Sequence, residues 1–81
     1  MSKKSQQWFV LTEDQLFRLV GQGTYSGAQD ALEEVRKIKD ASQTPAIYYS
    51  EFNDFRIINE HDPEQFRIAL SISSRAKRFQ M

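Results

Sequence analysis

The chain has 81 residues, which is enough for one domain and too few for two. Hydrophobic residues make up 40% of it and aromatic residues 12%, so the composition is that of a folded globular domain rather than a disordered chain. Because it has no cysteine and only one histidine, disulfides, cysteine-based zinc sites, thiol catalysis and a histidine-rich metal site within one chain are excluded.

The net charge is zero, with 11 basic and 11 acidic residues, but the charges are unevenly distributed. All the acidic residues lie between Glu13 and Glu64, whereas the segment from Gln65 onward contains basic residues and no acidic ones. No apolar run is long enough to cross a membrane, and no apolar stretch follows the lysines near the start as it does in a secretory signal. We therefore expect a cytoplasmic protein that does not contact a membrane.

The first predicted elements are a strand and a short helix. The apolar run from Trp8 to Leu11 suits a strand. Thr12 is a good N-cap, and Gln15, three residues later, gives the spacing of a capping box. Gly21 stands where a helix commonly ends. The pattern therefore predicts a helix from Thr12 to about Gly21.

The clearest helix of the chain follows in the segment GAQDALEEVRKIKD. Thr24 or Ser26 can cap its start, and Pro45 prevents its continuation. Apolar residues recur on one side at helical spacing, at Ala28, Ala31, Leu32, Val35 and Ile38. Acidic residues fall mostly on the outside, at Asp30, Glu33, Glu34 and Asp40.

A hairpin is predicted in the segment AIYYSEFNDFRIINE, where two β-rich runs flank Asn53 and Asp54. A loop of two or four residues places Glu51 opposite Arg56 and Tyr49 opposite Ile58. In that register Tyr48, Phe52, Phe55 and Ile57 meet the helices, and an outer face remains with Ile47, Tyr49 and Ile58 at its centre and charges, including Arg56, around them. An apolar centre with a charged rim is typical of an interface. A loop of odd length would exchange the two faces.

The last segment fits two structures. QFRIALSIS alternates apolar and other residues as a strand does. Asp62 and Pro63, however, form a strong helix start. A helix running on to Phe79 also gathers polar residues on one side, namely Arg67, Ser71, Ser74, Arg75 and Arg78. A helix accounts for the start signal and for the polar side together, whereas a strand accounts only for the first part of the segment. We therefore predict a helix.

These elements predict an α+β fold with the order β-α-α-β-β-α. We expect a small three-stranded antiparallel sheet, with the first strand beside the hairpin and the helices packed on one face. Residues 1–6 are polar and are expected to be disordered, and residues 7–80 are expected to form the single domain.

No arrangement of residues suggests catalysis. Nucleophilic catalysis needs a hydroxyl or thiol group beside a base. The only imidazole is that of His61, which adjoins a helix cap and is a poor candidate for this base. The pairs Glu13–Asp14 and Glu33–Glu34 are adjacent on helices, so their carboxylates diverge. The segment GQGTYSG lacks the spacing of a phosphate-binding loop. We therefore expect no enzymatic activity, no cofactor and no metal.

The leading hypothesis is a non-catalytic protein-binding module. The acidic residues Asp30, Glu33, Glu34 and Asp40 suit a basic target, and Tyr49, Arg56 and Ile58 form the second predicted contact surface. Short chains without cysteines or motifs are common among inhibitors that phages and mobile elements use to block host defence or nucleic-acid-processing complexes. The alternative is a small nucleic-acid-binding or regulatory protein that contacts phosphates through Arg67, Arg75 and Arg78. A homodimer is the third partner class considered.

Overall fold

The computed structural model describes residues 7–79. The expected disorder of residues 1–6 and the end of the expected domain at residue 80 lie outside this range. Within it the chain forms four strands and three helices: β1 (Trp8–Leu11), α1 (Glu13–Gln22), α2 (Ala28–Asp40), β2 (Pro45–Ser50), β3 (Phe55–Asn59), α3 (Pro63–Ser73) and β4 (Lys77–Arg78). The strands make one sheet in the order β3-β2-β1-β4.

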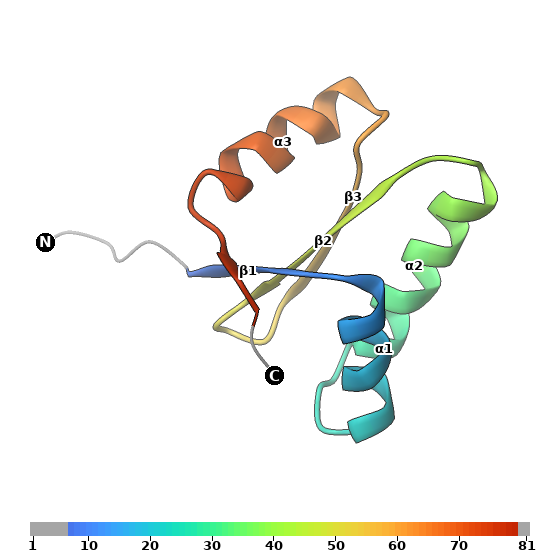
Figure 1. Cartoon of the computed structure of the whole chain (residues 1–81), viewed down its shortest axis with the longest axis vertical. Coiled ribbons are helices and arrows are strands. Elements are labelled where there is room, and N and C mark those ends of the chain that lie inside the picture. Colours follow the sequence, from blue (N-terminus) through green and yellow to red (C-terminus); the bar gives the residue numbers. More distant parts are fainter. Residues whose placement is uncertain (1–6, 80–81) are drawn as a thin grey trace, which may run out of the picture.

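The sheet lies between two helical layers, with α1 and α2 on one face and α3 on the other (Figure 1). β1 pairs with β2, and β2 with β3, in antiparallel fashion, whereas β4 runs parallel to β1. The α+β class and the order β-α-α-β-β-α are as predicted. The prediction of a three-stranded antiparallel sheet with helices on one face is wrong, because the sheet is mixed, has four strands and is covered on both faces.

Each face of the sheet carries its own apolar cluster. Under α1 and α2 the buried residues are Leu11, Leu16, Leu19, Ala28, Ala31, Leu32, Val35, Ile47 and Tyr49. Under α3 they are Trp8, Tyr48, Ile58, Ala69 and Ile72. Because successive side chains of a strand point to opposite faces of the sheet, each strand can contribute residues to both clusters. A strand with apolar residues on both sides therefore packs against helices on both faces.

The helix starts follow different chemistry. In α1 the backbone N–H of Gln15 donates to Thr12 Oγ1 (3.1 Å) and Gln15 Oε1 accepts from the N–H of Thr12 (2.9 Å), which confirms the capping box. The helix continues past Gly21 to Gln22, and Gly23 caps its end with a left-handed φ of 73°. α2 is preceded by Gly27 at φ 87° with no side-chain cap, so the predicted caps at Thr24 or Ser26 are wrong.

β2 and β3 form the predicted hairpin in a different register. Tyr49 pairs with Phe55, and Ala46 pairs with Ile58. The loop between Tyr49 and Phe55 therefore spans residues 50–54, an odd number of residues, instead of the predicted two or four. Side chains alternate between the two faces along a strand. An odd loop therefore places residues of β2 and β3 that were predicted to share a face on opposite faces of the sheet.

Ser50 accounts for the loop length. Its side chain is fully buried (0% exposed), and its Oγ accepts hydrogen bonds from the N–H groups of Phe52 (3.1 Å) and Asp54 (3.3 Å). The N–H of Ser50 donates to the carbonyl of Asp54 (2.8 Å), which closes the loop. Asn53 takes the left-handed conformation (φ 67°) that lets the chain reverse.

The register overturns the predicted outer face of the hairpin. Ile47 and Tyr49 point toward α1 and α2, whereas Ile58 points toward α3. Tyr49 is 6% exposed and Ile58 is 2% exposed, so both belong to the core. The predicted apolar centre of an interface does not exist at these positions.

α3 begins at Asp62 and Pro63 as predicted, but it ends at Ser73. In its last turn the Ser73 hydroxyl donates to the Leu70 carbonyl (3.3 Å) and the Ser74 hydroxyl to the Ser71 carbonyl (2.9 Å). The chain then returns along β1 as β4. The predicted helix to Phe79 is therefore wrong in its last part.

Phe79 explains why the chain turns back. Its ring packs edge-on against Phe9 (centroids 6.0 Å apart) and Tyr49 (5.8 Å apart), on the face covered by α1 and α2. Its N–H donates to the Val10 carbonyl (3.1 Å), and its carbonyl accepts from the Gln15 side chain (3.0 Å). Partial burial of this aromatic ring stabilises the return of the chain along β1.

Candidate protein-binding site

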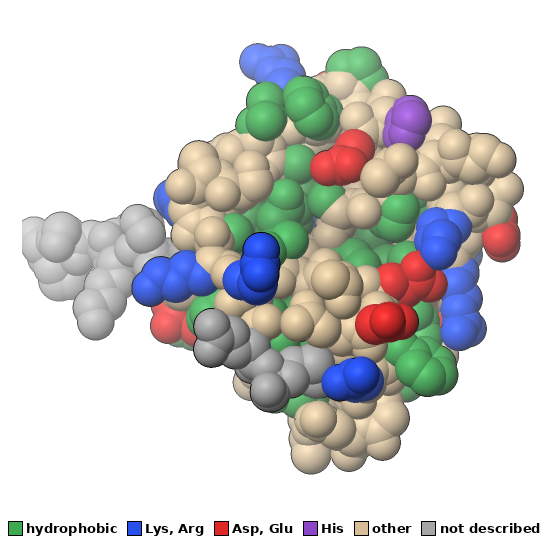
Figure 2. Space-filling model, viewed as in Figure 1, with side chains coloured by type: hydrophobic (Ala, Val, Ile, Leu, Met, Phe, Trp, Pro, Cys, Tyr) green, Lys and Arg blue, Asp and Glu red, His purple; other side chains and the backbone are tan. Residues whose placement is uncertain are grey.

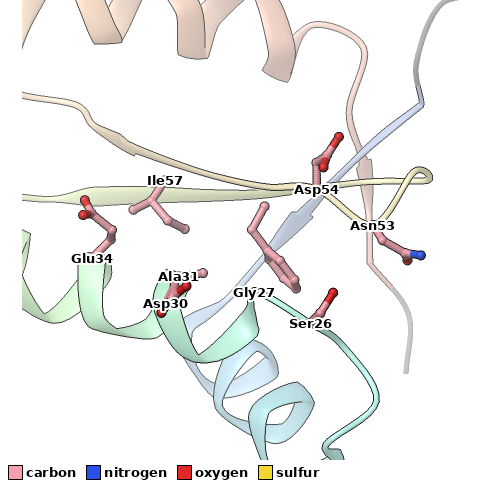
Figure 3. A pocket seen from close by; sticks show the side chains of 9 residues that line it. Ser26, Gly27, Asp30, Ala31, Glu34, Asn53, Asp54 and Ile57 are labelled. Atoms are coloured by element: carbon pink, nitrogen blue, oxygen red, sulfur yellow. The ribbon is translucent and has the colours of Figure 1, made fainter.

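A groove lies between α2 and β3. Its volume is about 490 Å³ and it is open to solvent. One wall is formed by the start of α2 and the residues before it, and the other by β3 and the hairpin loop (Figure 3). The lining residues are Ser26, Gly27, Asp30, Ala31 and Glu34 on the first wall, and Asn53, Asp54, Phe55 and Ile57 on the second. We call this feature the α2–β3 groove.

The α2–β3 groove is acidic above an apolar floor. Phe55 and Ile57 are half-buried, and Phe55 extends toward Gly27, at which an added Cβ would stand 3.7 Å from the ring. Asp30 and Glu34 are exposed beside this floor, whereas the carboxylate of Asp54 points away from α2, toward the side of the sheet that α3 covers (Figure 3). The residues that line the groove include no Lys or Arg, so the charge of Asp30 and Glu34 is not offset among them.

The predicted acidic face of α2 divides into two parts. All four of its carboxylate residues are exposed. Asp30 and Glu34 are four residues apart, so they lie on the same side of the helix, and both line the groove. Glu33 and Asp40 do not line it. Only half of the predicted acidic set is therefore brought together with the hairpin.

The one salt bridge of α2 among the described residues lies outside the groove. Lys39 pairs with Glu13 of α1 (2.6 Å), which places the ammonium group on the α1 side of the helix. Both side chains of this pair are well exposed, so it contributes little to stability. The salt bridge matters for the groove because it holds the ammonium group of Lys39 away from Asp30 and Glu34.

Tyr49 occupies the core instead of an interface. Its ring lies 4.8 Å from that of Phe55 and 5.6 Å from that of Tyr25, and its hydroxyl bonds to Asn53 Oδ1. Burial, and then the neighbouring Tyr25, raise the pKa of Tyr49 above the usual 10.0. Tyr49 thus supports the hairpin loop and the groove floor from beneath.

The other predicted contact residues of the hairpin are separated. Arg56 is exposed and pairs with Tyr48, so it lies on the α3 face of the sheet, opposite the groove. Ile58 shares that face and packs with Trp8 and Ile72 in the cluster under α3. Tyr49, Arg56 and Ile58 therefore do not form one surface.

The three predicted phosphate-binding arginines are exposed but do not share an element. Arg67 is in α3, Arg75 follows its end, and Arg78 is in β4. The Ser74 hydroxyl, which was expected to join them, donates to the Ser71 carbonyl instead. The predicted continuous stripe is not formed.

Seven of the nine lining residues were not predicted as site residues, and those on the hairpin wall are Asn53, Asp54, Phe55 and Ile57. They depend on the odd loop, which turns Phe55 and Ile57 toward α2. The available signal was Ser50, a small polar residue whose hydroxyl can bond the loop amides, as short polar side chains commonly do in turns.

His61 is exposed, with Nε2 3.1 Å from Thr44 Oγ1. Across residues 7–79 no group of three or more metal-binding side chains is arranged to hold an ion. None of the helices in this range is long and apolar enough to span a bilayer.

Comparison of the chain with protein-family models, with curated proteins and with solved structures gave no match.

Proposed function

We propose that this chain is a non-catalytic protein-binding module that recognises a basic partner protein at the α2–β3 groove. The observation that carries the proposal is the position of Asp30 and Glu34 beside the apolar floor made by Phe55 and Ile57. An apolar centre with a charged rim is the usual anatomy of a protein interface. The carboxylates would attract a basic surface and speed association.

Binding at the groove would cover a surface of the partner. A small chain that occludes a basic, nucleic-acid-processing or defence protein would act as an inhibitor of the kind that phages and mobile elements encode. The acidic charge of the groove suits such a target, because proteins that handle nucleic acids carry basic surfaces.

The test uses the chain as bait for proteins of its native host, together with two charge-reversed variants. Asp30→Lys with Glu34→Lys changes the groove, whereas Glu33→Lys with Asp40→Lys makes the same charge change on the same helix outside it. The wild type and the second variant should retain the same proteins at low salt, and the groove variant should lose them. Retention by all three baits, or by none, contradicts the proposal.

Nucleic acid is the competing partner class, because Arg67, Arg75 and Arg78 are all exposed. Fluorescence anisotropy with a labelled single strand and a labelled duplex at low salt separates the two. The protein-binding proposal predicts no change in anisotropy. Salt-dependent binding that is lost when these three arginines become alanine would instead assign the chain to nucleic acid.

A further inference from the structure

β3 is an edge strand whose outer backbone groups can be identified. Among the described residues its one neighbour in the sheet is β2. The Ser50 N–H donates to the Asp54 carbonyl (2.8 Å), and the Glu60 N–H donates to the Thr44 carbonyl (2.9 Å), at the two ends of the β2–β3 ladder. Bonded pairs alternate with non-bonded pairs in an antiparallel ladder.

These two hydrogen bonds and the alternation identify the residues of β3 whose backbone groups bond to β2. The bonded pairs between these ends are Tyr48–Arg56 and Ala46–Ile58. The N–H and C=O groups of the other residues of β3, namely Phe55, Ile57 and Asn59, therefore point away from the sheet.

Asn59 is already satisfied at this edge. Its N–H donates to Gln65 Oε1 (2.8 Å), and its carbonyl accepts from the Asp62 N–H (3.1 Å). Across residues 7–79, the outward backbone groups of Phe55 and Ile57 have no such partner. The open length of the edge thus consists of the two residues that form the floor of the α2–β3 groove.

The acidic residues of α2 are spaced to match an added strand. Residues two apart in a strand are about 6.8 Å apart and point to the same face. Asp30 and Glu34 are one helical turn apart, about 6 Å along the axis. Glu34 lies beside Ile57, and Asp30 lies further along the groove toward Gly27 (Figure 3). Alternate side chains of an added strand would meet these carboxylates in turn.

We propose that an extended basic segment of the partner protein binds by adding to β3 as a further strand. Its backbone pairs with the free groups of Phe55 and Ile57, and its alternate Lys or Arg side chains face Asp30 and Glu34. The other side chains of the segment lie on the same face as Arg56, where uncharged residues fit better than basic ones. This inference rests on the proposed function and specifies how the groove recognises its partner.

A second copy of the chain fits this edge less well. Symmetric pairing of two β3 strands brings the carboxylates of both grooves together, and like charges in such proximity destabilise a complex. The segment is therefore assigned to a basic partner rather than to another copy. Sedimentation of the full chain alone tests this assignment. A monomer at micromolar concentration is expected, and a dimer that the groove variant dissociates would overturn it.

The probe for strand addition is a ten-residue peptide of alternating arginine and threonine, with blocked ends. Binding to the full chain is measured by calorimetry or fluorescence anisotropy at low salt. Asp30→Lys with Glu34→Lys should weaken binding at least about tenfold, because two attractive pairs become repulsive. Glu33→Lys with Asp40→Lys should change it less than about threefold.

Two N-methylated forms of the peptide test the backbone pairing. An antiparallel added strand uses the arginine amides, and a parallel one uses the threonine amides. Methylation of one set should abolish binding, while methylation of the other leaves it within about threefold. The two peptides have the same charge, so electrostatic attraction alone affects both equally.

The outcomes separate the two proposals. If both methylated peptides bind as the parent does, strand addition is wrong, although an effect of the groove charges would still support the proposed function. If the parent peptide does not bind the wild type, strand addition is also wrong, and the bait experiment decides the proposed function independently.

Discussion

Ser50 is the residue on which the geometry of the hairpin depends most. It is fully buried, and its Oγ accepts hydrogen bonds from the N–H groups of Phe52 and Asp54, so one hydroxyl holds two backbone amides of the loop. Asp54 and the following Phe55 both line the groove. The shape of the candidate site is therefore linked to a side chain that does not itself line it.

Ser50→Ala should lower the free energy of unfolding by about 1 to 3 kcal/mol, because the loop amides lose their acceptor at a buried position. Urea denaturation measures this change. Ser71→Ala, at an exposed position of α3, is the matched control and should change stability by less than about 0.5 kcal/mol. Equal stability of both variants would show that Ser50 does not support the loop in this way.

Tyr48 gives stability a dependence on alkaline pH. Burial, and then the negative charge of Glu60, raise the pKa of Tyr48 above the usual 10.0, and a hydrogen bond with Ser73 offsets part of this rise. The neutral phenol is thus favoured in the folded state. The resulting stabilisation is complete below pH 10.0 and is lost as the pH rises through the raised pKa of the folded protein.

Tyr48→Phe should consequently make the loss of stability above pH 10 shallower than in the wild type, since phenylalanine does not ionise. Urea midpoints measured between about pH 8 and pH 11 test this, and comparison at each pH removes the contribution of lysines common to both proteins. Parallel curves for the two proteins would contradict the effect attributed to Tyr48.

One side of α3 is buried against the sheet, and the other side is exposed to solvent. Ala69 and Ile72 are buried against the sheet, whereas Phe66, Ile68 and Leu70 are exposed, and hydrophobic surface is visible over α3 in Figure 2. The apolar alternation of this segment arises because apolar residues occupy both sides of the helix. Its cap at Asp62 and Pro63 identifies it as a helix, and this part of the prediction is confirmed.

Ile72→Ala should cost about 2 to 4 kcal/mol of stability, because it removes buried methyl groups at a position that is 5% exposed. Leu70→Ala, at 53% exposed, should cost less than about 1 kcal/mol. Urea denaturation of both variants measures the difference. A larger loss for Leu70→Ala would mean that α3 packs on the sheet through its other side.

At the level of elements, local signals predicted the structure where the cause is local. The capping box of α1 and the apolar stripe of α2 depend on residues within a few positions of each other, and both predictions are confirmed. β4 could not be predicted in this way. It is two residues long and depends on contacts of Phe79 with Phe9 and Tyr49, which are remote in the sequence.

At the level of the whole molecule, the number of residues in one loop decides which side chains share a surface. The odd loop at residues 50–54 moves Tyr49 and Ile58 into separate core clusters and directs Phe55 and Ile57 toward α2. The sequence alone therefore identified Asp30 and Glu34 as binding candidates but missed the hairpin half of the groove. The arginines were likewise separated by the early end of α3.

The α2–β3 groove is the site at which we propose that this chain binds a basic partner segment. The most direct measurement is titration of the uniformly ¹⁵N-labelled chain with the alternating arginine–threonine peptide, followed by amide chemical shifts. We expect the largest changes at Phe55 and Ile57 and along α2 from Asp30 to Glu34. Changes spread evenly over exposed acidic residues elsewhere, such as Glu51, Glu60 and Glu64, would contradict it.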